Sequence, residues 1–89
     1  MPEISLPIVN EKGLHARASA KLVEVVEGFD ACAEVSKDGI TASGDSIMGL
    51  LMLAAARGST IDITTSGVDA DALADALTAL VADKFGEGK

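Results

Sequence analysis

The chain has 89 residues, of which 48% are apolar, and this length suits one small domain over residues 1–89 with a single hydrophobic core. Its formal net charge is −7, from 14 acidic and 7 basic residues, which argues against partners that require a basic patch, namely nucleic acid and anionic membrane surfaces. A single cysteine cannot form an internal disulfide, and one cysteine with one histidine falls short of a metal site.

A period-two pattern near the N-terminus predicts a strand with one buried face. Its apolar positions are Ile4, Leu6 and Ile8. Pro7 has no N–H to donate, so this strand is expected at an edge of its sheet. Residues 10–14 follow as a loop, in which Gly13 is free to adopt a positive φ.

A helix is predicted over residues 16–27, and Gly28 suits the C′ position that ends it. The apolar face of this helix comprises Leu22, Val25 or Val26, and Phe29. Strands are then predicted over 31–35 and 40–42, and Asp38-Gly39 between them is a strong signal for a hairpin turn. Cys32, which lies between two alanines, is interpreted as a small core residue.

Ser46 is a natural N-cap for a second helix, which Arg57 and Gly58 are expected to close. Residues 61–65 alternate as a fourth strand, and Asp69 is expected to cap a last helix. The apolar face of the last helix comprises Leu73, Leu77, Leu80 and Val81. The tail over residues 86–89 is expected to be frayed.

The predicted order is βαββαβα, with no linker or repeat to divide it. Three amphipathic helices against one face of a small sheet make a two-layer sandwich. The N-terminal residues lack both the basic start and the apolar run of a signal peptide, and no apolar stretch is long enough to span a bilayer. The expected location is therefore the cytoplasm.

The only histidine, His15, follows a glycine-containing loop and immediately precedes a predicted helix. A single histidine is more often structural or merely exposed than functional, but the placement of His15 before a helix favours a functional role. The first turn of a helix has N–H groups without intrahelical partners, and together with the helix dipole they form an anion site. Arg17 adds a guanidinium whose geometry suits phosphate. Since an imidazole nitrogen is a good nucleophile near neutral pH, His15 could carry a transferable phosphoryl group.

Two motifs resemble those of the HPr phosphocarrier family. Gly13-Leu14-His15-Ala16-Arg17 matches the phosphohistidine motif G-L-H-A-R, and Ser46-Ile47-Met48-Gly49-Leu50 is similar to the S-I-M-G-L stretch, which Ala56-Arg57-Gly58 follows. The resemblance covers nearly the whole chain. It implies an α+β open-faced sandwich, with a four-stranded antiparallel sheet, three helices on one face and the first strand at an edge.

The resemblance also implies a function and partners. Members accept a phosphoryl group from Enzyme I of the phosphoenolpyruvate-dependent phosphotransferase system and pass it to an EIIA-type acceptor, acting as stoichiometric carriers rather than enzymes. By this resemblance, His15 carries the phosphoryl group, Arg17 and the backbone of residues 16–18 (Ala16, Arg17, Ala18) bind it, and Ser46 is the target of HPr kinase/phosphorylase. Partner docking is expected at Ile47, Met48, Leu51 and Ala20. A monomer without cofactor or metal is expected.

The chain departs from the family pattern at three positions. Ala18 stands where most members have proline, and Glu24 and Glu27 stand where many have basic residues. Alanine leaves an additional N–H in the first helical turn, whereas proline would have stiffened it. The acidic, alanine-rich sequence is similar to that of proteobacterial members that use the phosphoryl cascade for regulation, which include the nitrogen-type branch.

Several readings remain open. Ser46 could be a plain N-cap, and Met48 could be core, although Ile47, Leu50 and Leu51 already define an inward face and leave Met48 pointing outward. The chain could also be an interaction module that never carries phosphate. A small hydrolase using His15 with Ser19 or Ser46 is disfavoured because no acid is apparent to orient the histidine.

Overall fold

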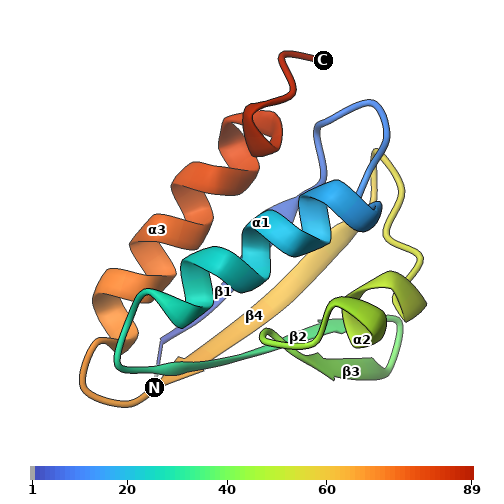
Figure 1. Cartoon of the computed structure of the whole chain (residues 1–89). Coiled ribbons are helices and arrows are strands. Elements are labelled where there is room, and N and C mark those ends of the chain that lie inside the picture. The colour runs from blue at the N-terminus through green and yellow to red at the C-terminus, as the bar shows by residue number, and fades with distance from the viewer. Residues whose placement is uncertain (1) are drawn as a thin grey trace.

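The computed structural model describes residues 2–89, and its elements follow the predicted βαββαβα order (Figure 1). They are β1 (Glu3–Pro7), α1 (Ala16–Glu27), β2 (Cys32–Lys37), β3 (Ile40–Ser43), α2 (Ile47–Met52), β4 (Thr60–Ser66), α3 (Ala70–Ala82) and a short 3-10 turn, η1 (Lys84–Gly86). None of the helices within residues 2–89 is long and apolar enough to cross a membrane.

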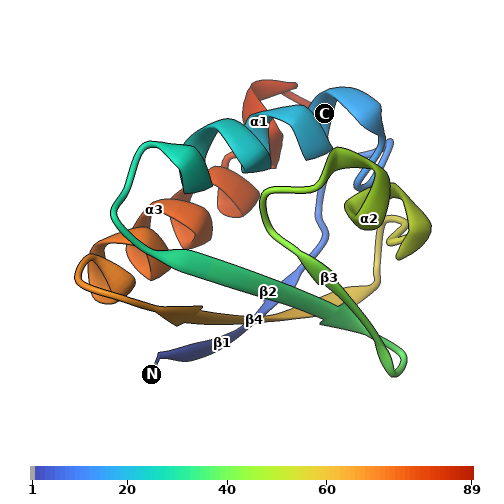
Figure 2. The same cartoon turned by 60° about the horizontal axis from the view of Figure 1, so that its bottom comes forward.

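The strands form one antiparallel sheet in the order β1-β4-β2-β3. β1 is therefore an edge strand, as Pro7 predicted, because proline cannot donate to a second neighbour. Figure 2 shows α1, α2 and α3 on one face of the sheet, with the opposite face open. The fold is thus the expected α+β open-faced two-layer sandwich.

The hydrophobic core lies between the sheet and the helices. Ile61 and Ile63 of β4 are completely buried. Leu22 of α1 and Leu77 of α3 meet them from the helical layer and are also completely buried. Phe85 in η1 is the largest of the fully buried side chains, and burying a side chain of this kind is worth about 1.5–3 kcal/mol. The chain after α3 is therefore anchored in the core.

The hairpin between β2 and β3 is the one predicted. Asp38 and Gly39 have φ values of 51° and 82°, and positive φ at both central positions is the requirement of a type I′ turn. The interpretation of Cys32 as a core residue is wrong, since Cys32 is exposed. Side chains alternate along a strand, so Ala33 and Val35 face the core and Cys32 faces solvent.

Two helix ends differ from the prediction. Gly28 ends α1, but its φ is −78°, so it does not take the left-handed C′ conformation. Asp69 occupies the N-cap position of α3 without capping it, because its carboxylate accepts a hydrogen bond from the Asp30 N–H at 2.8 Å.

The second helix is shorter than predicted. α2 begins after Ser46 as expected but ends at Met52, well before Arg57. Ala54 adopts φ +52°, and the carbonyl oxygen of Ala55 accepts a hydrogen bond from the Leu14 N–H at 2.8 Å. A long-range contact with the loop before α1 therefore replaces the last helical turn.

The C-terminal tail is not frayed, contrary to the expectation for residues 86–89. The N–H of Glu11 donates to the Lys89 carbonyl oxygen at 2.8 Å, and Nζ of Lys21 donates to the Phe85 carbonyl oxygen at 2.6 Å. These bonds hold the tail beside the loop that precedes α1, and Figure 1 shows the C-terminus on the side of that loop.

Candidate functional site

His15 occupies the N-cap position of α1 in an extended conformation, and its side chain makes no capping hydrogen bond. The preceding loop is docked tightly. Gly13 has φ +67°, and a Cβ at this position would lie 2.5 Å from the Ala55 carbonyl oxygen. The next residue, Leu14, is buried and donates its N–H to the same oxygen. Glycine is therefore required here, and it fixes the direction from which the chain presents the imidazole.

The first turn of α1 offers unpartnered backbone donors. The N–H of Ser19 is the first to reach an intrahelical carbonyl, that of His15, at 2.8 Å. Within residues 2–89, the N–H groups of Ala16, Arg17 and Ala18 have no hydrogen-bond partner. They lie where the positive end of the helix dipole attracts an anion. Ala18 contributes one of these donors, which proline at this position would lack.

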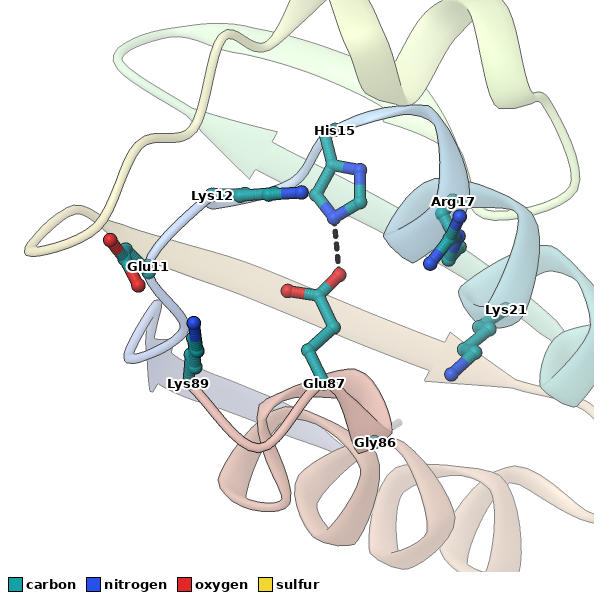
Figure 3. Close-up of a pocket in the computed structure, with 8 residues that line it drawn as sticks. All are labelled: Glu11, Lys12, His15, Arg17, Lys21, Gly86, Glu87 and Lys89. Carbon is teal, nitrogen blue, oxygen red and sulfur yellow. Dashed lines mark hydrogen bonds and ion pairs between the residues drawn. The ribbon is translucent and has the colours of Figure 1, made fainter.

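A cleft of about 380 Å³ opens beside the His15 ring (Figure 3). Its lining residues are Glu11, Lys12, His15, Arg17, Lys21, Gly86, Glu87 and Lys89. Four of them are cationic, although the chain as a whole carries a net charge of −7. The Arg17 side chain is exposed and makes no ion pair within the described residues 2–89. Its guanidinium is therefore available to an anion in this cleft.

Glu87 is the residue that sequence reasoning missed. Its Oε2 pairs with His15 Nε2, and its Oε1 accepts a hydrogen bond from Asn10 Nδ2 at 3.0 Å (Figure 3). The side chains of His15 and Glu87 are 28% and 13% exposed, so the pair is largely shielded from water. The expectation that no acid accompanies His15 is wrong, because the tail returns to the site. The only sequence signal was Phe85, an aromatic residue near the end of an otherwise polar tail.

The Glu87 carboxyl is held in its ionised form. Burial acts to raise its pKa, but hydrogen bonds from Asn10 and His15 and attraction to His15 and Lys12 outweigh burial and leave the pKa below its usual value. An ionised carboxylate can only accept hydrogen bonds, so Nε2 of His15 carries the proton that it donates. In the neutral ring, Nδ1 is then the nitrogen with a free lone pair, and in Figure 3 it lies on the side of the ring toward Arg17.

The second motif lies at the start of α2. Ser46 caps this helix as predicted, with its Oγ accepting a hydrogen bond from the Gly49 N–H at 3.1 Å. Met48 is 71% exposed, as expected for an outward side chain. Ile47 is 40% exposed, so the prediction that it faces inward is wrong. Leu50 is the one residue of this six-residue helix that is buried.

The structure brings only part of the expected docking set next to His15. Leu51 is partly buried and lines a more open depression of about 270 Å³ together with Lys12, Leu14 and His15. Ala20 is partly buried on α1. Neither it nor Ser46, Ile47 or Met48 lines either hollow beside the ring.

Two small residues in the first turns of α1 are buried and so do not face the approach to His15. Ala18 and Ser19 are completely buried, and the Ser19 hydroxyl donates to the Leu14 carbonyl oxygen at 3.4 Å. Ala16 is exposed and leaves the helix start accessible. No group of three or more potential metal-binding His, Cys, Asp or Glu side chains occurs within residues 2–89.

Comparisons with known proteins agree with these motifs. The family model described as "PTS HPr component phosphorylation site" matches residues 2–83. The chain is 48% identical over 82 residues to the phosphocarrier protein HPr of Cupriavidus necator, covering 92% of each. It is 45% identical over 85 residues to the phosphocarrier protein NPr of Shewanella violacea, covering 96% of this chain and 93% of that protein.

A similar solved structure is that of HPr-C-His from Thermoanaerobacter tengcongensis, with a TM-score of 0.93, 34% identity and coverage of 98% of each chain. The fold, both motifs and the match over most of the chain's length agree. This chain belongs to the HPr family of phosphocarrier proteins of the phosphotransferase system.

Proposed function

We propose that this protein is a stoichiometric carrier that accepts a phosphoryl group from phospho-Enzyme I on His15 and passes it to an EIIA-type acceptor. One observation carries this proposal: His15 stands beside three unpartnered N–H groups at the start of α1, with its Nε2 bound by Glu87. Nδ1 is thereby left as the nucleophile. The proposed place of action is the cytoplasm.

The site suits a carrier because it can hold a phosphoryl group without enclosing it. A phosphoryl group on Nδ1 would carry about two negative charges, toward which the helix start and Arg17 both present donors. The ring is 28% exposed, so it remains reachable by a partner protein. The closed environment needed for transfer must then come from the partner.

A hydrolase is the weaker alternative. Glu87 does orient His15, as the acid of a triad would, but no suitable hydroxyl accompanies them. Ser19 is completely buried, and Ser46 is bound to the N–H of Gly49. A pure interaction module also fits poorly, because it would need neither the free helix N–H groups nor the bound imidazole.

The test is to incubate the purified protein with phosphoenolpyruvate and Enzyme I. A carrier gains one phosphate that is labile in acid and stable in base, as expected of a phosphorylated imidazole. An interaction module gains none, and a hydrolase releases phosphate or cleaves an ester without retaining the label.

Arg17→Ala is expected to slow phosphoryl acceptance without abolishing it. The backbone N–H groups of α1 would still hold the phosphoryl oxygens, and one charge-assisted hydrogen bond is worth about 1.5–3 kcal/mol. This corresponds to a loss of about tenfold to a hundredfold in the rate, measured by rapid-quench labelling from phospho-Enzyme I. Lys37→Ala, which removes a cation at the end of β2, is the control and should leave the rate unchanged. An unchanged rate in Arg17→Ala would show that the guanidinium does not contact the phosphoryl group.

Partner docking is proposed on the surface formed by Ile47, Met48, Leu51 and Ala20. Ile47 and Met48 are large apolar side chains left exposed at the start of α2, and Leu51 extends this surface into the depression beside His15. Exposed apolar side chains next to a reactive group are typical of protein docking sites. The partners proposed for it are Enzyme I, the EIIA-type acceptor and, for Ser46, HPr kinase/phosphorylase, with the carrier itself a monomer.

Phosphorylation of Ser46 is expected to weaken the phosphorylation of His15 by Enzyme I without destabilising the fold. A phosphate on Ser46 would meet the N-terminal end of α2, where negative charge is favourable, so the melting temperature should be unchanged or higher. The added charge would lie at the edge of the apolar docking surface and repel an acidic partner. Enzyme I kinetics and thermal melting of modified and unmodified protein provide the measurement. A lower melting temperature would contradict the capping argument, and unchanged kinetics would contradict the docking argument.

A further inference from the structure

The tail reaches His15 through an unusual backbone path. Lys84 and Phe85 both have φ +55°, and Gly86 has φ +75°, so three successive residues lie in the left-handed region. Residues other than glycine rarely adopt this conformation, and it persists where surrounding contacts hold it. Here Phe85 is completely buried and its carbonyl oxygen accepts from Lys21 Nζ. The strained turn reverses the chain and delivers Glu87 to the imidazole.

A buried amide fixes the role of each oxygen of Glu87. Asn10 is completely buried, and its Nδ2 donates both to the Gly13 carbonyl oxygen at 2.7 Å and to Glu87 Oε1 at 3.0 Å. Since both partners are acceptors, the amide cannot be turned around. Asn10 Oδ1 is buried and has no partner within residues 2–89, which is a cost that folding tolerates. Asn10 thus fixes Oε1, and Oε2 faces His15.

We infer that Glu87 is a positioning residue that, held by Asn10, selects the imidazole tautomer with the proton on Nε2 and so keeps the lone pair of Nδ1 free for phosphoryl transfer. This role rests on the carrier function proposed above. It concerns a residue of the C-terminal tail, outside both motifs that identify the family.

The transfer step balances with Glu87 in this role. The lone pair of Nδ1 forms the new N–P bond while the bond from phosphorus to the donor breaks, and its electron pair stays on the donor. The proton on Nε2 does not move. The ring then carries the phosphoryl group on Nδ1 and a proton on Nε2, and the Glu87 carboxylate balances the positive charge of that ring. Onward transfer returns the electron pair to Nδ1.

Glu87→Gln is the sharpest test because the two amide ends are not equivalent. Asn10 Nδ2 requires an acceptor, so the glutamine oxygen should face Asn10 and its NH2 should face His15. Nε2 must then accept a hydrogen bond, which moves the ring proton to Nδ1 and occupies the nucleophilic lone pair. Glu87→Ala imposes neither tautomer. Glu34→Gln is the matched control, since Glu34 is an exposed carboxylate on β2 that does not line the cleft beside His15.

Two readouts are needed. 15N NMR of the unphosphorylated protein, at a pH where the ring is neutral, should show Nε2 protonated in the wild type and in Glu34→Gln, and Nδ1 protonated in Glu87→Gln. Rapid-quench labelling should show acceptance slowed about tenfold or more in Glu87→Gln, less in Glu87→Ala, and not in Glu34→Gln. If Glu87 had a purely structural role, Glu87→Gln would not accept the phosphoryl group more slowly than Glu87→Ala. Circular dichroism should show that each variant is folded.

The outcomes separate the two proposals. If the wild-type protein takes no label, the carrier function is refuted. The positioning role is then refuted with it, whichever tautomer NMR shows. If the wild type is labelled and Glu87→Gln accepts the phosphoryl group as fast as Glu34→Gln, the carrier function stands and the positioning role is overturned. Protonated Nε2 in Glu87→Gln overturns it as well.

Discussion

His15→Ala is expected to abolish Enzyme I-dependent labelling while leaving the fold intact. The chain contains one histidine, so no second imidazole can replace it. The His15 side chain makes no capping hydrogen bond to α1, and its partly exposed ion pair with Glu87 is worth about 0–1 kcal/mol. Removing the side chain should therefore lower the free energy of unfolding only slightly. The measurement is the mass increase of the folded variant after incubation with phosphoenolpyruvate and Enzyme I.

A second substitution separates the chemistry of His15 from its contact with Glu87. His15→Gln keeps an N–H donor that can reach toward the carboxylate but has no nucleophilic ring nitrogen. It should therefore be as unlabelled as His15→Ala while retaining more of the wild-type stability. Wild-type labelling of either folded variant would place the phosphoryl group on another residue and end the carrier hypothesis.

Gly13→Ala is expected to cause the largest loss of stability among these variants. The residue has φ +67°, and a Cβ would lie 2.5 Å from the Ala55 carbonyl oxygen and 2.9 Å from the Ala56 Cα. A left-handed alanine costs about 1–2 kcal/mol and overpacking costs about 1–3 kcal/mol, so the free energy of unfolding should fall by about 2–5 kcal/mol. For a domain of this size that lowers the melting temperature by roughly 10 °C or more. Thermal melting followed by circular dichroism measures it.

Gly39→Ala is the matched control for Gly13→Ala. Gly39 has φ +82°, but a Cβ there would meet no atom within 4 Å. This variant should therefore lose only the conformational part, about 1–2 kcal/mol. Equal losses in the two variants would show that the close approach between the His15 loop and Ala55 does not constrain residue 13.

The elements that could be predicted from the sequence are those with a local cause. Alternation defined the strands, Asp38-Gly39 formed the expected turn because its residues tolerate positive φ, and Ser46 capped α2 through a hydrogen bond three residues away. The placement of His15 at the start of α1 is equally local, since the apolar spacing of that helix is present in its own residues. The two family motifs then predicted the candidate site around His15.

The predictions that failed depend on contacts between distant segments. The alanines after Met52 suit a helix, yet the Ala55 carbonyl oxygen accepts a hydrogen bond from the Leu14 N–H. No pattern within that segment predicts a partner so far away in the chain. Ile47 was placed inward by helical spacing alone, but it is the first residue of α2 and is 40% exposed, and Leu50 is the residue of this helix that is buried. In both cases tertiary packing outweighed local preference.

The largest gap concerns Glu87, which lies in a stretch with the composition of a frayed tail. Its position depends on a buried Phe85, on a left-handed turn that local preferences disfavour, and on Asn10 at the other end of the chain. The sequence by itself determined the order of the elements and the position of the candidate histidine, because periodicity, caps and turns act over a few residues. Only the tertiary structure decided which carboxylate meets that histidine, because a contact across 72 positions of chain is made by packing and leaves no local pattern to read.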